Sequence, residues 1–382
     1  MYRASTAVLI AALGLGCADT SPSVTESTGG CAVGQFLTPS AVATCLATAG
    51  AISSADRDRA LALFGTAAAV DDSLTSIPGA PKFEQAADLT RSLGSISDYY
   101  SRQMFPDSIR FHRMLDQVGV TLDFARGQLP FDVNGFAHPL ETPYLGWHQY
   151  PFGLFFQPLE TMYQTLWIVP RTDIPVDSLV QIAERLYGYA VWRRFGNVQF
   201  PTWEYEFDWT SGGVTTKGPW ISSLAQGPAM MLFAETYRRT GNHVWLDRAY
   251  ATLQSLRVTW DRGGVLLSDT THGYWWEGFH PIVMIWNEAA EVVVNVAFLA
   301  NLTGDPVVQA MYAKGALALK YYTPFFDTGS WTLYSRTQGY NNTFYHDLSI
   351  QRLDGLYQLT GDPWYKTTAD RWRSYTPPPG IQ

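Results

Sequence analysis

The chain has 382 residues, which is enough for one large core or two domains. Charged residues make up only 16% of it and aromatic residues 14%, with 14 Trp, 21 Tyr and 20 Phe, so a disordered chain is excluded. The net charge of −8 disfavours a nucleic-acid-binding protein, because binding phosphate requires a basic surface. The surplus of Trp and Tyr fits a groove for sugar rings and ordinary core packing equally well.

The first residues have the pattern of an export signal. Arg3 precedes an apolar run over residues 4–16, which is too short to span a membrane and ends in small residues before Cys17. We therefore predict a lipoprotein-type signal peptide over residues 1–17, with lipid attached to Cys17 and the mature protein periplasmic or at the cell surface. Plain secretion is the alternative, because Gly14 stands where bacterial lipoproteins usually have Leu.

The three cysteines agree with this prediction. If Cys17 carries lipid, Cys31 and Cys45 remain as a pair that could close a short loop in an oxidising compartment, contributing about 3 kcal/mol at that span. Residues 18–35 are expected to be a flexible tether, because their first part is rich in Ser, Thr and Gly. After residue 16 the longest apolar stretch, 281–300, is interrupted by polar residues and predicts an amphipathic helix with a solvent-facing stripe: Asn287, Glu288, Glu291 and Asn295.

The N-terminal half shows helical patterns without a visible domain boundary. Helices are expected over residues 54–71, 83–93, 108–118, 159–168 and 177–195, and a strand-and-loop insertion over 135–151. Residues 36–376 are accordingly treated as one catalytic region.

The C-terminal half contains an internal repeat. Thr-Gly-Asn at 240–242 and Thr-Gly-Asp-Pro at 303–306 and 360–363 each follow one helical pattern and open another. In such a motif Gly ends a helix in the left-handed conformation, Asn or Asp caps the next helix, and Pro takes its first position. The spacing predicts a series of helical hairpins.

Long aromatic loops lie at the other end of these hairpins, at residues 202–209, 273–281, 327–334 and 340–347. The stretch 331–334 alternates as a short strand does. We therefore predict a mainly α protein, an α/α toroid of helical hairpins with short β-hairpins in the long loops, whose binding cleft is built from those loops.

Motifs for nucleotide cofactors, structural or catalytic metals and a serine nucleophile are missing from the sequence. The seven histidines do not pair at metal-ligand spacing. The chemistry is therefore expected to rely on side chains alone, and a structural calcium ion is left open.

Four sequence blocks recur in a known family. They are WISSLAQG at 220–227, Trp276-Glu277 followed by Asn287, DTGS at 327–330 with Tyr334, and Tyr345-His346 with RWRSY at 371–375. From about residue 219 to 375 the chain thereby resembles the C-terminal domain of the glucuronyl C5-epimerases, which convert glucuronate into iduronate within heparan-type polymers. Weaker similarity reaches Tyr150-Pro151, and the epimerase-like core is placed at residues 201–376.

The resemblance implies an α/α toroid without an organic cofactor, acting on a uronic-acid polysaccharide or oligosaccharide. Tyr345 matches the catalytic tyrosine of the family. Glu277 matches the glutamate of a Glu-Tyr pair, but Gly278 follows it, so the second proton carrier is missing from its place. Tyr274 and His280 are the candidates to replace it.

Substrate contacts are expected at seven positions: Trp220, Gln226, Trp276, Asn287, Tyr334, Arg336 and His346. A structural or surface role is the alternative at five of them: Gln226, Trp276, Asn287, Arg336 and His346. Epimerisation at C5 requires two proton-transfer groups on opposite sides of the sugar ring. It also requires a cation or amide donors that neutralise the carboxylate as the enolate-like state develops. Arg336 and His346 are the neighbours expected to help Tyr345 act as a base.

Three other functions are kept open. A polysaccharide lyase would share the removal of the C5 proton and then expel the O4 substituent. A glycoside hydrolase would use paired carboxylates from Glu204, Glu206 and Asp208. A non-catalytic glycan-binding surface protein would explain the missing tyrosine. The expected partners are the uronic-acid polymer and, through Cys17, a membrane, with homodimerisation left open.

Overall fold

The computed structural model describes residues 31, 34–75, 83–105, 108–129, 136–137, 145–150, 153–167 and 169–381. The export signal predicted for residues 1–17 lies outside the described residues, and so does most of the tether predicted for residues 18–35.

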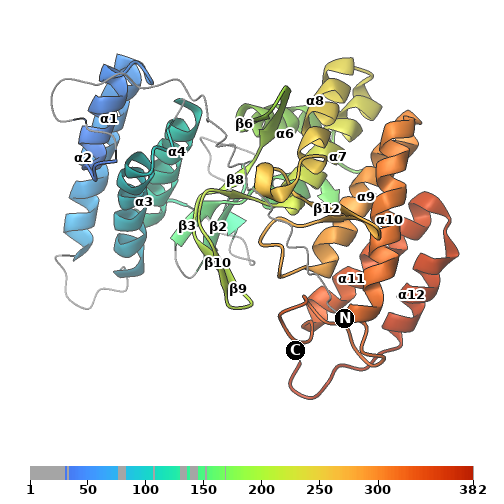
Figure 1. Ribbon diagram of the computed structural model, residues 1–382. Coiled ribbons are helices and arrows are strands. Elements are labelled where there is room, and N and C mark those ends of the chain that lie inside the picture. The colour runs from blue at the N-terminus through green and yellow to red at the C-terminus, as the bar shows by residue number, and fades with distance from the viewer. Residues whose placement is uncertain are drawn as a thin grey trace, which may run out of the picture.

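Within these ranges the protein is mainly helical (Figure 1). The helices are α1 (Pro39–Thr48), α2 (Ser54–Thr75), α3 (Phe83–Ser101), α4 (Ser108–Ala125), α5 (Pro158–Tyr163), α6 (Val176–Gly188), α7 (Ser223–Thr240), α8 (His243–Leu253), α9 (Trp286–Thr303), α10 (Pro306–Phe326), α11 (Thr343–Thr360) and α12 (Pro363–Arg373). Two short 3-10 helices, η1 (Gln254–Leu256) and η2 (Trp260–Arg262), follow α8.

The strands are short and pair antiparallel. One sheet has the order β1 (Phe136–Ala137), β2 (Trp147–Tyr150) and β3 (Gly153–Phe156). The others are pairs: β4 (Leu166–Trp167) with β5 (Val169–Pro170), β6 (Val191–Phe195) with β7 (Val198–Thr202), β8 (Glu204–Tyr205) with β11 (Trp220–Ile221), β9 (Trp209–Ser211) with β10 (Val214–Thr216), and β12 (Leu266–Thr270) with β13 (Gly273–Trp276).

The turns predicted at the Thr-Gly motifs are confirmed. Each glycine ends its helix in the left-handed conformation, with φ of 68°, 65° and 70° at Gly241, Gly304 and Gly361. The next side chain then caps the following helix by accepting a backbone N–H, at Asn242, Asp305 and Asp362. These caps produce three helical hairpins, α7–α8, α9–α10 and α11–α12.

The hairpins form an inner and an outer row of helices. Helix α9 packs between α7 and α11, while α8, α10 and α12 each pack against the inner helix of their own hairpin. Most side chains of α7 and α9 are buried, whereas α8 and α12 bury only one face. A Cβ on Gly315 of α10 would lie 2.4 Å from the ring of Trp276, so glycine is required where β13 crosses this helix.

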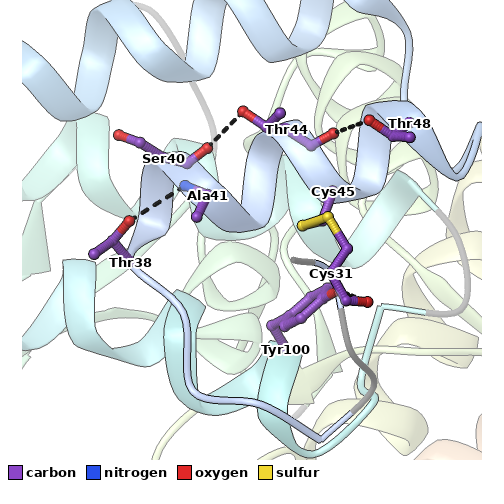
Figure 2. Close-up of a disulfide and its surroundings, with 8 residues drawn as sticks. All are labelled: Cys31, Thr38, Ser40, Ala41, Thr44, Cys45, Thr48 and Tyr100. Carbon is purple, nitrogen blue, oxygen red and sulfur yellow. Dashed lines mark hydrogen bonds between the residues drawn. A yellow bond between two sulfur atoms is a disulfide. The ribbon is translucent and has the colours of Figure 1, made fainter. Parts of the chain in front are cut away.

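The first four helices form a separate bundle, which lies at the far side of the molecule from α9–α12 in Figure 1. Residues of α1–α4 surround their own hydrophobic core, a division that the sequence patterns did not predict. The pairing of Cys31 with Cys45 is confirmed, and Figure 2 shows this disulfide joining the segment before α1 to the middle of that helix. The hydroxyl of Tyr100, from α3, donates to the carbonyl of Cys31 at 3.5 Å.

Buried ion pairs connect this bundle to the rest of the protein. Arg110 of α4 donates from Nε and Nη2 to the two carboxylate oxygens of Glu204 in β8, both at 2.9 Å. Arg193 of β6 donates to the same carboxylate at 2.7 Å. Arg113 pairs with Glu206 at 3.3 Å. Since both carboxylates are buried, the bundle holds its position through charges that have no alternative partner in solvent.

Two predicted helices were too long. The pattern at residues 177–195 ends as a helix at Gly188, and Val191–Phe195 is instead strand β6. Three of its five residues, Val191, Trp192 and Phe195, are β-branched or aromatic, and the Gly196-Asn197 turn that follows favours a hairpin. The pattern at 159–168 likewise ends at Tyr163 and continues into β4. Residues 331–334 form isolated bridges, Asp327 with Thr332 and Leu333 with Tyr340.

The polar stripe of α9 was also predicted wrongly. Its four polar residues are at most 7% exposed and point into the protein rather than to solvent: Asn287, Glu288, Glu291 and Asn295. Sequence periodicity identified the stripe but could not show that partners on α7 and α11 cover it. Over the described ranges, none of the helices combines the length and apolar character that crossing a bilayer requires.

Candidate functional site

A cavity of about 530 Å³ lies among α5, the first turns of α7 and α9, and α11. Its wall contains three phenols, two amides, one carboxylate, one guanidinium and several apolar side chains: Tyr163, Tyr334, Tyr345, Gln157, Asn287, Glu160, Arg352, Leu159, Leu224, Ile285, Phe344 and Leu348. A few polar groups on a largely apolar surface are typical of a site that orients a small ring-shaped ligand.

Helix capping positions Tyr345 in this wall. Asn342 is the N-cap of α11, and its side-chain oxygen accepts the backbone N–H of Tyr345 at 2.9 Å. The phenol ring lies against that of Tyr334, with ring centroids 4.9 Å apart and planes at 64°. Tyr334 is held in turn by its backbone N–H, which donates to the carbonyl of Gly339 at 3.0 Å. The structure therefore brings two of the predicted site residues together.

The two hydroxyls are electrostatically unequal. Burial raises the pKa of both phenols, because the low dielectric disfavours a phenolate. At Tyr345 the hydrogen bond with Tyr334 lowers the pKa in opposition to burial, whereas the same bond raises the pKa of Tyr334. The hydrogen bond therefore favours ionisation of Tyr345 over ionisation of Tyr334, so Tyr345 is the phenol better prepared to lose its proton.

A second hollow of about 420 Å³ adjoins the cavity across the same two tyrosines. Besides Tyr334 and Tyr345 it is lined by residues of β9 and of the loop before α11: Trp209, Thr210, Ser211, Gln338, Gly339, Tyr340 and Asn342. The tyrosine pair thus lies between the cavity and the adjoining hollow. A chain-like ligand could extend from one into the other past these two side chains.

Arg352 is a buried cation in the cavity wall. Its side chain is 1% exposed and forms an ion pair with Glu291 of α9, which is equally buried. Its Nη2 donates to the hydroxyl of Tyr163 at 3.1 Å. Burial raises the pKa of Glu291, against the opposing attraction of Arg352. Guanidinium, carboxylate and phenol thus form one network across α11, α9 and α5.

Glu277 lies outside the cavity wall. It is fully buried, and its carboxyl oxygens accept the backbone N–H groups of Ile285 at 2.8 Å and Gly278 at 3.2 Å. Burial, followed by the adjacent charge of Glu288, raises the pKa of Glu277 well above its ordinary value. Its burial and its hydrogen bonds to the backbone give Glu277 a structural position in the loop before α9 rather than contact with a ligand.

Trp276 and Gln226 are also too deeply buried to contact a sugar. Trp276 has no exposed surface, and its indole N–H donates to the carbonyl of Leu256 at 2.8 Å. The Gln226 side chain bonds the backbone of Trp203 and Pro201, at 3.2 and 2.9 Å. Both residues hold loops against α7 and α10, so their placement does not fit the predicted substrate contacts.

The two candidates for the second proton carrier lie away from the cavity wall. Tyr274 of β13 packs under Lys314 of α10, whose ammonium group is 4.6 Å from the ring centroid. His280 packs against Trp260, with ring centroids 5.6 Å apart. The further phenol that the structure brings to the cavity is Tyr163.

His346 belongs to a buried cluster with Trp331 and Trp372, next to the loop 327–334. Its ring stacks on Trp331 at 3.6 Å, and its Nε2–H donates to the carbonyl of Trp372 at 3.1 Å. Burial lowers the pKa of His346, so the ring is neutral. Asp327 accepts hydrogen bonds from Trp372 and Tyr375 at 2.8 and 2.7 Å. The recurring blocks at 327–330, 345–346 and 371–375 therefore contact one another in this cluster, and His346 points into the cluster.

Trp220 and Arg336 flank the site at a greater distance. The Trp220 indole stacks on Tyr205, with centroids 4.2 Å apart, and its N–H donates to the carbonyl of Phe207. It packs with Tyr334 around Phe279 and Val283. Arg336 is exposed, and its guanidinium contacts the sulfur of Met284 at 3.9 Å. Neither residue lines the cavity around Tyr345, although Asn287 does.

The carboxylates expected for a glycoside hydrolase lie elsewhere. Burial alone would raise the pKa of Glu204, but Arg193 and Arg110 outweigh it and lower the pKa to about 2. Burial raises the pKa of Glu206 to about 7. Glu204 has no exposed surface, so it cannot reach a glycosidic bond. Asp208 pairs with Lys217 at the surface.

Sequence reasoning missed Arg352, Tyr163 and Gln157. Arg352 lies seven residues after Tyr345 in the same helix and therefore on the same face, which is a signal that helical periodicity carries. Tyr163 lies in α5 and Gln157 is the N-cap of that helix, nearly 200 residues earlier in the chain, and no local pattern connects them to α11.

Fold and site together define a mainly helical protein whose cavity is lined by phenols and one buried cation. The sequence model of the family described as D-glucuronyl C5-epimerase C-terminus matches residues 197–374. The resemblance expected from the sequence blocks is thereby supported for this part of the chain.

The chain is also similar to individual proteins. It is 25% identical over 184 residues to an uncharacterized protein of Methanocaldococcus jannaschii, covering 46% of this chain and 58% of that protein. It is 23% identical over 177 residues to the D-glucuronyl C5-epimerase of Caenorhabditis elegans, covering 41% of this chain and 29% of that enzyme. The matched segments thus span about half of the first relative and less than a third of the second.

Two solved structures are distantly similar. A sugar epimerase from a ruminal bacterium superposes with a TM-score of 0.40 at 11% identity, covering 70% of this chain and 71% of its own. The GH76 α-mannanase of Bacteroides thetaiotaomicron superposes with a TM-score of 0.33 at 16% identity, covering 51% of this chain and 53% of its own.

Proposed function

We propose that this protein epimerises glucuronate residues at C5 in a polysaccharide or oligosaccharide, converting glucuronate to iduronate. The observation that carries the proposal is the contact between the rings of Tyr345 and Tyr334 in the wall of a cavity that also contains the buried cation Arg352. The match of residues 197–374 to the C-terminal model of the D-glucuronyl C5-epimerases supports it.

The proposed reaction removes a proton from C5 of the sugar and adds a different proton to C5. Tyr345, as a phenolate, takes the hydrogen on C5 as a proton, and the electron pair of the C–H bond moves into the adjacent carboxylate to give an enolate-like state. A proton delivered to the opposite face of C5 completes the inversion. An ordinary tyrosine has a pKa near 10, so the base needs a donor that stabilises its phenolate, and Tyr334 is in place to donate.

The second proton carrier in this proposal is Tyr163. It replaces Tyr274 and His280, because it is the phenol of the cavity wall that comes from a different element, α5. Its hydroxyl receives a hydrogen bond from Arg352, which stabilises the phenolate left after it gives up a proton. Burial raises its pKa, so Tyr163 holds its proton at neutral pH, as an acid must.

Several finer expectations belong to the same proposal. The helical hairpins of residues 201–376 are proposed to be part of an α/α toroid, with α7, α9 and α11 as its inner helices. The protein is proposed to be exported and anchored by a lipid on Cys17. The disulfide in the N-terminal bundle supports an oxidising compartment.

Product analysis tests the proposal. Purified protein is incubated with unsulfated and sulfated glucuronate polymers, and the products are examined by NMR for iduronate, by ultraviolet absorbance for unsaturated uronate and by a reducing-end assay. Iduronate without the other two signals is expected. Unsaturated product would instead indicate a lyase, new reducing ends a hydrolase, and binding without any product a glycan-binding protein.

A further inference from the structure

The hydrogen-bonding groups of Arg352 are only partly satisfied. Its Nε faces Glu291 and its Nη2 donates to Tyr163, whereas Nη1 is buried without a hydrogen-bond acceptor among the described residues. A buried guanidinium with an unpaired N–H group destabilises the folded protein, because the donor has lost its hydrogen bonds to water and has formed none with the protein. Such an edge is best explained by a ligand that supplies the acceptor.

Helix geometry directs the side chain of Arg352 toward the turn that carries Tyr345. Arg352 lies two turns after Tyr345 on the same face of α11, and side chains of a helix lean toward its N-terminus. The Tyr163 hydroxyl accepts a hydrogen bond from Arg352. Burial and the charge of Glu291 raise the pKa of Tyr163, and the charge of a Tyr345 phenolate raises it further, so the two phenols are close enough to interact electrostatically. Phenol and guanidinium therefore border one ligand-sized space.

We infer that Arg352 binds the carboxylate of an acidic sugar residue through its Nη1 edge, and so selects uronates over neutral sugars in this cavity. The inference rests on the proposed function, in which C5 and the carboxylate carbon are bonded neighbours. A base at C5 and a cation at the carboxylate must therefore lie within one sugar residue of each other, and Tyr345 and Arg352 line the same cavity. The planar guanidinium holds Glu291 on one edge and the substrate carboxylate on the other.

The same position gives Arg352 a part in the reaction. When the C5 proton leaves, negative charge grows on the carboxylate oxygens, and a buried cation stabilises that charge more than a solvated one would. Arg336, the cation expected from the sequence, is exposed and contacts Met284 instead. It therefore offers a matched control: an arginine close to the site in sequence that does not line the cavity.

Binding measurements separate this inference from the proposed function. Titration calorimetry compares a glucuronate-containing oligosaccharide with its carboxyl-reduced form, in which each glucuronate has become glucose. The proteins are the wild type, Arg352→Gln, Arg336→Gln and the double variant Glu291→Gln/Arg352→Gln. The double variant removes both charges, so it leaves no buried carboxylate unpaired and guards against loss of folding, which thermal unfolding checks.

The wild type and Arg336→Gln should prefer the acidic oligosaccharide. Both variants without Arg352 should lose about 10- to 100-fold in affinity for it, with affinity for the neutral form unchanged. Equal affinity of the wild type for both forms would overturn the inference, as would binding of neither form or a preference that survives in the folded double variant. Since no turnover is required, a preference without iduronate formation would leave the inference standing while the proposed reaction fails.

Discussion

The substitution Tyr334→Phe isolates the hydrogen bond on which the reactivity of Tyr345 depends. It removes one hydroxyl and keeps the ring that packs 4.9 Å from Tyr345. A hydrogen bond to a charged acceptor contributes about 1.5–3 kcal/mol, so its loss should raise the pKa of Tyr345 by about 1–2 units beyond the increase that burial already causes. Below that pKa the phenolate fraction falls about tenfold per unit, so kcat/KM at neutral pH should fall by about 10- to 100-fold.

The assay is the pH dependence of C5 hydrogen exchange on a glucuronate oligosaccharide, from neutral pH to about pH 11. The rising limb for Tyr334→Phe should move to higher pH by about 1–2 units. Tyr340→Phe is the matched control, because Tyr340 lines the neighbouring hollow and is 47% exposed. An unmoved limb in Tyr334→Phe, or an equal shift in Tyr340→Phe, would refute the assignment of donor and base.

Three further predictions concern other parts of the molecule. Glu204→Gln leaves Arg110 buried without its carboxylate and should lower the free energy of unfolding by about 3 kcal/mol at pH 7. Because the pKa of Glu204 is lowered to about 2 in the folded state, its stabilising effect is complete above its unfolded pKa and is lost as the pH falls toward 2. The difference in stability between wild type and variant, measured by thermal unfolding, should therefore shrink over that acid range. Replacing both Cys31 and Cys45 by Ser should cost about 3 kcal/mol, visible in chemical unfolding as loss of the N-terminal bundle, whereas an unchanged transition would show that the disulfide adds nothing. Glu277→Gln can still accept the backbone N–H of Ile285 and lies outside the cavity wall, so it should retain kcat within about tenfold of the wild type in the exchange assay. A loss as large as that of Tyr345→Phe would make Glu277 a proton carrier after all.

The parts of the fold that were predictable are those whose causes are local. The caps at Gly241, Gly304 and Gly361 depend on three or four consecutive residues, and the pairing of Cys31 with Cys45 followed from counting cysteines. The end of α6 was less visible, because an amphipathic helix and a following strand both present apolar residues at short intervals.

The site was predictable only in part, because its residues meet through tertiary contacts. Tyr345, Tyr334 and Asn287 were expected, and the structure places them in one wall. Recurrence in the family also directed attention to Trp276 and His346, which are buried and hold the loops that carry the site. Sequence recurrence does not separate residues that contact a ligand from residues that position those contacts.

The arginine of the site was likewise not predictable from the sequence alone. Arg336 adjoins the loop of Tyr334, which favoured it on the sequence alone, but it is exposed and contacts Met284. Arg352 was overlooked because its meaning depends on Glu291 of α9 and Tyr163 of α5, both far from it in the chain. Buried charges acquire their roles from such distant partners.

Hydrogen exchange at C5 tests the central claim, that the phenol of Tyr345 carries a proton between the sugar and solvent. Wild-type protein and Tyr345→Phe are incubated with a glucuronate polymer in heavy water, and deuterium at C5 is measured by NMR. The wild type should place deuterium at C5 of both glucuronate and newly formed iduronate, and Tyr345→Phe, correctly folded by thermal unfolding, should place none. Deuterium incorporation by Tyr345→Phe at the wild-type rate, or no incorporation by the wild type on any glucuronate polymer tried, would contradict the account.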